Sequence, residues 1–338
     1  MPNAFLGSEF RQTTRDARTV MTAETLHLPN HPGVHCHLWQ RRNGPDTCQM
    51  GTVIALHGLG DHGARFDDLA AKLLDERWAV AAIDFPGHGR SAGRHGACIP
   101  YDTLLGMVAD LRQQLCDRLG CQRHVLLGHS MGGNLAVNYT LRQHEFAAAG
   151  LPDLNGLVLL APLFRPPQPL DRTQLLAAWM TGYLVPWIRM GQTPDITQLT
   201  NDPNAVRQFR NDPLQHSRIS LYNATQLLAQ GRFALDHASE LTTPTMVIVG
   251  DQDALIDRTA CQHFVMRAGE FATFVEWPNA LHDLLHDVDG DRVGRQIAGW
   301  ISRRCSGQGA ASSDGIGDRE SSGYHERATI PFSRSMIA

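Results

Sequence analysis

The chain has 338 residues, of which 42% are hydrophobic and 19% are charged, and its formal net charge is -4. This composition is ordinary for a globular protein. There is no long run of Lys and Arg, which argues against nucleic acid as a partner, because phosphate contacts need clustered cations. At about 150 residues per domain the length would suit two domains, but α/β folds of this size often form one.

The first 22 residues carry charges throughout and lack an apolar block of signal-peptide length, so we expect a loose leader. No uninterrupted apolar stretch is long enough to cross a bilayer. We therefore expect a cytoplasmic protein that can also act peripherally at membranes. The seven cysteines are odd in number and form no C-x-x-C pair, which argues against a disulfide framework or a thiolate zinc site.

Short apolar runs alternate with longer helical patterns, which predicts an α/β fold with a mostly parallel sheet and helices on both faces. The runs at 26–28 and 34–39 flank a turn that contains proline and glycine, and they predict a hairpin at the sheet edge. Further strands are predicted at 52–56, 79–83, 123–127, 157–160, 245–249 and 273–277, giving eight in total.

Helical patterns follow most of these strands, at about 65–76, 104–119 and 134–142, and after the last two strands up to about 269 and 303. Residues 163–240 contain no clear strand and are predicted to form a helical cap inserted into a domain that spans 23–304. Residues 305–338 are rich in Gly, Ser and charge, and we expect a disordered tail.

A Gly-x-Ser-x-Gly motif runs from Gly128 to Gly132, with Ser130 at its centre. It directly follows a predicted strand and precedes a predicted helix, which is the placement of a nucleophile elbow. There the serine must stand on a sharp turn, and side chains two positions away would collide, so both are glycine. The alternative is a plain strand-turn-helix junction with a capping serine.

Acyl transfer at such a serine needs two N–H donors for the developing oxyanion. The residue after the nucleophile, Met131, supplies one, and we expect Leu59 to supply the other from the loop His57-Gly58-Leu59-Gly60-Asp61-His62-Gly63. The glycines of this loop do not continue as G-x-G-x-x-G, so no dinucleotide site is predicted, and we expect no cofactor.

The base and acid should follow in the order Ser, Asp or Glu, His. His282 is preferred over His286 because it lies on the loop after the last strand, one helical turn earlier. Asp253 is the favoured acid, since Asp257 looks like a helix N-cap and Asp251 is close to the strand end.

The remaining histidines are interpreted as structural. The run of His31, His35 and His37 could suggest a metal site, but no tight H-x-x-x-H with a carboxylate third ligand stands out, and we predict no metal.

With these residues in hand, the chain resembles the α/β-hydrolase superfamily, and more narrowly its monoacylglycerol lipase and lysophospholipase group of the serine aminopeptidase, S33 type. The resemblance covers about residues 50–300 and rests on HGLGDHGARFDDLAAKL, AAIDFPGHGRSAG, VLLGHSMGG, LVLLAPL, NDPLQHSRIS, VIVGDQDALID and WPNALHDLLHD. It implies Ser130 as nucleophile, Asp253 as acid and His282 as base. It also implies backbone oxyanion donors at Leu59 and Met131, and a cap over a lipophilic acyl pocket.

Within the cap, Trp179, Leu184, Val185 and Trp187 are candidates for binding the substrate. The segment is apolar on more than one side, so it either packs inside the cap or faces lipid, where it could touch micelles or membranes. The expected function is hydrolysis of a single-chain lipid ester such as a monoacylglycerol or lysophospholipid. An aminopeptidase or amidase on the same triad, and a hydrolase-fold protein that binds a ligand without turnover, are the alternatives.

Overall fold

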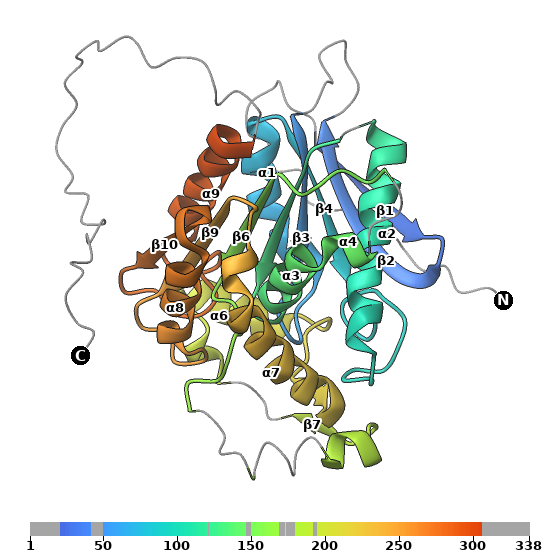
Figure 1. The fold of residues 1–338 in the computed structure, drawn as a ribbon, viewed down its shortest axis with the longest axis vertical. Coiled ribbons are helices and arrows are strands. Elements are labelled where there is room, and N and C mark those ends of the chain that lie inside the picture. Colours follow the sequence, from blue (N-terminus) through green and yellow to red (C-terminus); the bar gives the residue numbers. More distant parts are fainter. Residues whose placement is uncertain are drawn as a thin grey trace.

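The structure, a computed structural model, describes residues 21–41, 50–120, 122–146, 150–168, 173, 180–191 and 195–305. The predicted leader and tail lie outside these residues, apart from Met21, Thr22 and Cys305. The described part is built around one eight-stranded sheet with the order β1-β2-β4-β3-β5-β6-β9-β10 (Figure 1). Its strands are β1 (Met21–Leu28), β2 (His31–Arg41), β3 (Gly51–Leu56), β4 (Trp78–Asp84), β5 (His124–His129), β6 (Gly156–Leu160), β9 (Thr245–Gly250) and β10 (Ala272–Trp277).

The sheet is antiparallel only at the end that contains β1 and β2. These two strands form the expected edge hairpin, and β2 pairs antiparallel with β4, whereas every later pairing is parallel. All residues of β3, β4, β6 and β9 are buried, as continuous apolar strands are when helices cover both faces of a sheet. The predicted α/β class and mostly parallel eight-stranded sheet are confirmed.

Helices cover both faces of this sheet. On one face α1 packs against α9, and on the other, in front of the sheet in Figure 1, α2 contacts α3. The helices outside the cap are α1 (Asp67–Asp75), α2 (Tyr101–Leu119), α3 (Met131–Leu141), α4 (Gln143–Phe146), α8 (Arg258–Ala268) and α9 (Gly290–Cys305), with short turns η1 (Gly63–Phe66) and η4 (Gly269–Phe271). The last helix includes Cys305, which is buried, one residue beyond the predicted domain boundary.

The region predicted as a helical cap contains η2 (Ile196–Gln198), α6 (Pro203–Asn211), α7 (Leu221–Asp236) and η3 (Ala238–Glu240). It also contains a small antiparallel sheet of β7 (Arg189–Gly191) and β8 (Arg218–Ser220), so the expectation of no strand there was wrong. Three-residue strands are too short to show an alternating pattern in the sequence. Among the described residues, no helix combines the length and apolarity needed to span a bilayer.

Candidate active site

Ser130 occupies the sharp turn between β5 and α3, with φ 53° and ψ -112°. A non-glycine residue with positive φ is strained, and such strain is concentrated at functional sites. The two motif glycines are required by close backbone contacts. A Cβ on Gly128 would lie 2.2 Å from the carbonyl oxygen of Gly132, and one on Gly132 would lie 2.0 Å from that of Leu56. The turn can therefore form only with glycine at both positions.

His282 and Asp253 lie together at the ends of neighbouring strands, in the loops that follow β10 and β9. The Nδ1 of His282 is 2.7 Å from Oδ2 of Asp253, and only 6% of the histidine side chain and none of the aspartate side chain is exposed. Because Nδ1–H donates to the carboxylate, Nε2 has a lone pair with which it can accept a proton. The other oxygen of Asp253 accepts the N–H of Leu255 at 2.8 Å, which fixes the carboxylate.

The competing candidates make other contacts. Asp257 is the N-cap of α8, where it accepts the N–H of Ala260 at 3.2 Å. The His286 ring binds Asp283 and the carbonyl oxygen of Arg65 instead of a group near Asp253. Within the described residues, Ser130 Oγ forms no hydrogen bond with His282, a contact that is often long in unliganded hydrolases.

The loop 57–63 lies beside the nucleophile, because a Cβ on Gly58 would be 3.6 Å from the Cβ of Ser130. His57 fixes this loop: Nδ1–H donates to the Gly58 carbonyl at 2.7 Å, and Nε2 accepts the N–H of Phe85 at 3.1 Å. Met131 is the first residue of α3, so its N–H has no acceptor within the helix. This geometry is compatible with the oxyanion donors expected at Leu59 and Met131.

His129, which sequence reasoning assigned to the structural histidines, contacts the base segment directly. Its Nε2–H donates to the His282 carbonyl at 3.2 Å, and the two rings are 5.0 Å apart. Burial, and then the neighbouring His282, lowers the pKa of His129 to about 4, so the ring is neutral near pH 7. The position inside the Gly-x-Ser-x-Gly motif was the available signal, but the contact itself arises between distant segments.

The cap is joined to the loop 57–63 by two contacts that the sequence did not predict. The N–H of His216 donates to the Gly60 carbonyl at 2.9 Å, and His62 Nε2 lies 2.8 Å from Oδ2 of Asp212. Gly60 has φ 73°, and a Cβ there would lie 1.6 Å from the His216 carbonyl oxygen. The cap segment NDPLQHS therefore rests directly on the loop expected to bind the oxyanion.

Three side chains that could bind a metal, His35, His37 and Asp84, have ligand atoms within 4.8 Å of one another. The sequence did not place a carboxylate there. Asp84 already accepts the N–H of Gly63 at 2.6 Å and of Arg90 at 2.8 Å, and His37 lies 3.2 Å from both its oxygens. Burial opposes ionisation, but the bond from His37 holds the pKa of Asp84 well below its ordinary value. The carboxylate thus anchors the loop after β4.

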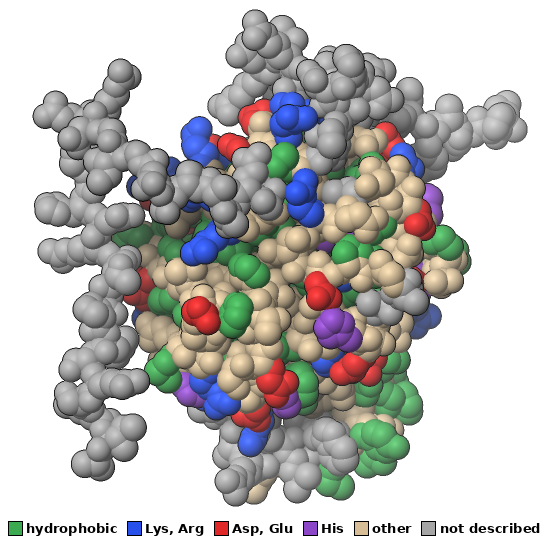
Figure 2. Space-filling view, turned by 45° about the horizontal axis from the view of Figure 1, so that its top comes forward, with side chains coloured by type: hydrophobic (Ala, Val, Ile, Leu, Met, Phe, Trp, Pro, Cys, Tyr) green, Lys and Arg blue, Asp and Glu red, His purple; other side chains and the backbone are tan. Residues whose placement is uncertain are grey.

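The candidate cap residues differ in exposure. Trp187 is 70% exposed and Leu184 67% exposed, whereas Val185 is half-buried and Trp179 lies outside the described residues. Figure 2 shows hydrophobic side chains at the lower right edge of the molecule, where the cap lies in Figure 1. The exposed apolar side chains of this segment are Met180, Tyr183, Leu184, Trp187, Ile188 and Met190. These side chains are exposed to solvent instead of packed inside the cap.

Comparison with known proteins identifies the family. The model for serine aminopeptidase, S33, matches residues 47–289. The chain belongs to this family. The match includes Ser130, Asp253 and His282, and it agrees with the α/β-hydrolase fold.

Among similar proteins, the monoacylglycerol lipase of Mycolicibacterium smegmatis is 27% identical over 267 residues, which cover 76% of this chain and 90% of that protein. Rat monoglyceride lipase is 27% identical over 316 residues, covering 88% of this chain and 96% of the relative. A Dictyostelium discoideum abhydrolase-domain protein is 26% identical over 262 residues, but the chain spans only 27% of its length.

Solved structures share the fold. A soluble variant of the Saccharomyces cerevisiae monoglyceride lipase, in complex with a substrate analogue, superposes with a TM-score of 0.70 at 18% identity, over 86% of this chain and 98% of that one. The Paleococcus ferrophilus monoacylglycerol lipase superposes with a TM-score of 0.67 at 22% identity, over 84% of this chain and 98% of that one. The relatives identify the chain as a carboxylic ester hydrolase, and the solved structures show that it shares their fold.

Proposed function

We propose that the protein hydrolyses single-chain lipid esters, with monoacylglycerols as the leading class and lysophospholipids as the next, through Ser130, His282 and Asp253. The observation that supports this most strongly is the buried 2.7 Å hydrogen bond between His282 and Asp253, in loops that follow adjacent parallel strands. The carboxyl ends of parallel strands lie at one edge of a sheet, and Ser130 follows β5 at that same edge.

In the proposed reaction, Ser130 Oγ attacks the ester carbonyl carbon while His282 Nε2 takes the hydroxyl proton. Asp253 stabilises the imidazolium that forms, and the N–H groups of Leu59 and Met131 bind the oxyanion. His282 then protonates the departing alcohol, which leaves an acyl group on Ser130. A water molecule, deprotonated by the same base, attacks this acyl-enzyme and releases the fatty acid. These steps need no cofactor.

The family description includes aminopeptidases, so amide hydrolysis is the competing function. An aminopeptidase needs an uncommitted carboxylate near the nucleophile to bind the substrate amine. Four carboxylates in the described part of the cap make other contacts: Asp202 caps α6, Asp212 contacts His62, Asp195 caps η2 and Asp236 pairs with Arg232. These contacts favour ester hydrolysis over the aminopeptidase reaction.

Two substrate series on one preparation test the proposal. We expect para-nitrophenyl esters and a monoacylglycerol to be turned over and aminoacyl anilides to be resistant, with all turnover lost in Ser130→Ala. A fluorophosphonate probe should label the wild-type chain and not this variant. Efficient anilide cleavage with weak ester turnover would instead support the aminopeptidase, and no labelling or turnover at all would support a ligand-binding protein.

We also propose that the exposed cap segment contacts the lipid aggregate that supplies the substrate. Tyr183 is 72% and Trp187 70% exposed, and aromatic side chains of this kind favour a membrane–water interface. In sedimentation with phosphatidylcholine vesicles, Trp187→Ser should weaken binding. Met266→Ser is the matched control, since Met266 is 69% exposed but lies on α8, outside the cap. Equal binding by both variants and the wild type would contradict the proposal.

A further inference from the structure

Arg65 is a buried cation that follows the loop 57–63 and belongs to η1. Only 9% of its side chain is exposed. Its Nε lies 3.1 Å from Oδ1 of Asp61, within the loop, and its guanidinium also forms an ion pair with Asp283, the residue after His282. One side chain thus joins the segment expected to bind the oxyanion to the segment that contains the expected base, although 218 positions separate Arg65 from Asp283 in the sequence.

Asp283 is the centre of a second set of contacts. Its Oδ1 lies 2.8 Å from Nδ1 of His286, and its backbone N–H donates to the Leu199 carbonyl of the cap at 2.8 Å. Burial would raise the pKa of Asp283, but His286 and Arg65 together lower it well below the ordinary value. The carboxylate is therefore an anion, and it is bonded on one side to the loop 57–63 through Arg65 and on the other to its own segment through His286.

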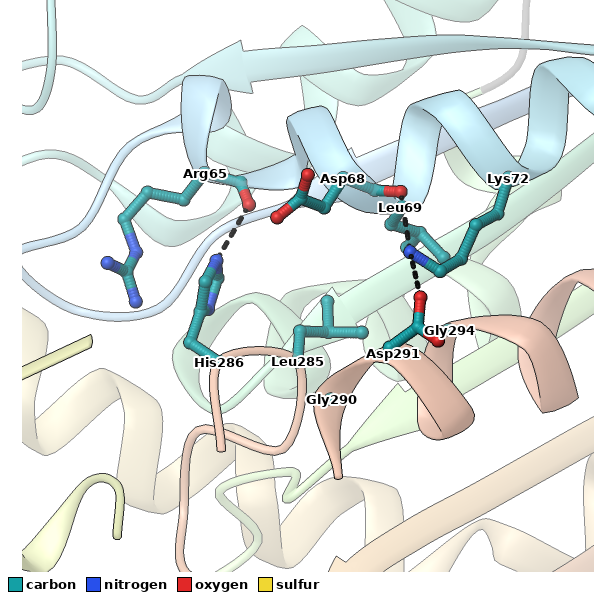
Figure 3. Close-up of a pocket in the computed structure, with 9 residues that line it drawn as sticks. All are labelled: Arg65, Asp68, Leu69, Lys72, Leu285, His286, Gly290, Asp291 and Gly294. Atoms are coloured by element: carbon teal, nitrogen blue, oxygen red, sulfur yellow. Dashed lines mark hydrogen bonds and ion pairs between the residues drawn. The ribbon is translucent and has the colours of Figure 1, made fainter. Parts of the chain in front are cut away.

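His286 closes the ring of contacts. Its Nε2–H donates to the Arg65 carbonyl at 3.0 Å, as Figure 3 shows, while the Arg65 guanidinium points away from Lys72 and Asp291. Both nitrogens of His286 thus make contacts: Nδ1 lies beside the Asp283 carboxylate and Nε2 beside the Arg65 carbonyl. Residues 281–287 contain no helix or strand, so the backbone beside His282 is fixed by contacts of this kind, including those of Asp283 and His286.

We infer that Arg65 and Asp283 are positioning residues. They fix the position of the segment that contains His282 relative to the loop 57–63, and they do not touch the substrate. The inference rests on the proposed function. A buried ion pair is weak evidence for stability, because its desolvation cost often cancels the attraction. Here the pair joins two segments whose relative position decides whether base, nucleophile and oxyanion donors converge. A displacement of about 1 Å at such a site can reduce the rate about 100-fold.

Two substitutions test this role while keeping the side chains similar. Arg65→Lys retains a positive charge against the two carboxylates, but a single ammonium cannot reproduce the two-sided geometry of the guanidinium. Asp283→Asn retains the shape of the side chain and removes its charge. Lys72→Met is the matched control: Lys72 lines a cavity of about 290 Å³ together with Arg65, but its ammonium pairs with Asp291 of α9 at 3.1 Å instead of with Asp61 or Asp283 (Figure 3).

The assay is turnover of a soluble short-chain para-nitrophenyl ester, expressed per active site titrated to completion with a fluorophosphonate, beside the melting temperature. We expect Arg65→Lys and Asp283→Asn to lower kcat about 10- to 100-fold. We expect KM to stay within about twofold, because ground-state binding of the ester is unchanged. Lys72→Met should leave both constants unchanged. A merely structural role would lower the number of titrated sites and leave kcat per site unaltered.

The outcomes separate this inference from the proposed function. If the wild type does not turn over the ester, or if Ser130→Ala keeps its activity, the proposed function fails. If the wild type turns over the ester but both variants keep kcat per site within about twofold of it, the positioning role is overturned. The same holds if Lys72→Met lowers kcat per site as much as the two variants do. Should Asp283→Asn not fold, Arg65→Lys decides alone, since it leaves no uncompensated buried charge.

Discussion

Replacing Asp253 by Asn isolates the contribution of one buried hydrogen bond to catalysis. Asn can keep the bond that Asp253 accepts from the Leu255 N–H, but its amide group would then donate toward Nδ1 of His282. The ring must respond by placing its proton on Nε2, where it can no longer accept one from Ser130. A wrong tautomer of this kind lowers kcat by about four orders of magnitude. This corresponds to about 5 kcal/mol of transition-state stabilisation.

We expect the full loss in kcat because solvent cannot replace the lost hydrogen bond: the Asp253 side chain is not exposed, and only 6% of the His282 side chain is. The assay is single-turnover and steady-state hydrolysis of a para-nitrophenyl ester, with circular dichroism to show that the fold is retained. Asp257→Asn is the control: four residues later, it should keep the α8 cap and full activity, since Asn caps as well as Asp. If Asp253→Asn stays within about tenfold of the wild type while Asp257→Asn is inactive, the acid is misassigned.

Further predictions concern the other groups. Ser130→Ala should lower kcat by about three orders of magnitude or more with the melting temperature unchanged, and His282→Ala should match it, because the triad acts as a unit; a greater loss in His286→Ala than in His282→Ala would show that the base is wrongly chosen. Across para-nitrophenyl esters, kcat/KM should rise from acetyl to medium chains and then level, since each buried methylene contributes about 0.8 kcal/mol; a flat profile would argue against an acyl pocket. His124 is buried, and burial followed by Arg112 lowers its pKa to about 3. In the unfolded chain the histidine has a pKa of about 6.5, so between about pH 3 and 6.5 the unfolded state binds more protons than the folded state. The contribution of the neutral His124 ring to folding stability is therefore complete above about pH 6.5 and is lost as the pH falls toward 3. The urea-unfolding free energy of His124→Gln should therefore depend less on pH than that of the wild type over this interval, and identical pH slopes would count against the buried neutral ring.

The elements that position the site could be predicted because their signals are local. Apolar runs predicted all eight strands of the main sheet. The signal is strongest in β3, β6 and β9, because strands that pair only in parallel are buried on both faces. The Gly-x-Ser-x-Gly motif is equally local. Gly128 lies too close to Gly132, and Gly132 too close to Leu56, for either glycine to carry a Cβ, so the motif contains the glycines that its turn requires. Asp257 was identified as a cap because capping depends on neighbours three residues away.

Other features could not be predicted from the sequence because their cause is not local. Among the described strands, β7 and β8 pair only with each other, and each is too short to have a periodicity. The carboxylate Asp84 lies beside His35 and His37 because β4 pairs with β2, which no spacing along the chain indicates. In the cap, composition could not decide between packing and a lipid-facing surface, and the exposure of Leu184 and Trp187 follows from how the cap folds.

Sequence alone determined the fold class and the identity of the candidate nucleophile, acid and base, since order along the chain and position after a strand restrict the choices to a few residues. Only the tertiary structure brought His282 to within hydrogen-bonding distance of Asp253 and away from Asp257. It alone joined Asp61 and Asp283 through Arg65 and placed Asp212 against His62. The physical reason is that a charged side chain is buried only where a partner compensates it, and that partner is supplied by whichever segment the packed sheet and cap bring close, however distant in the chain.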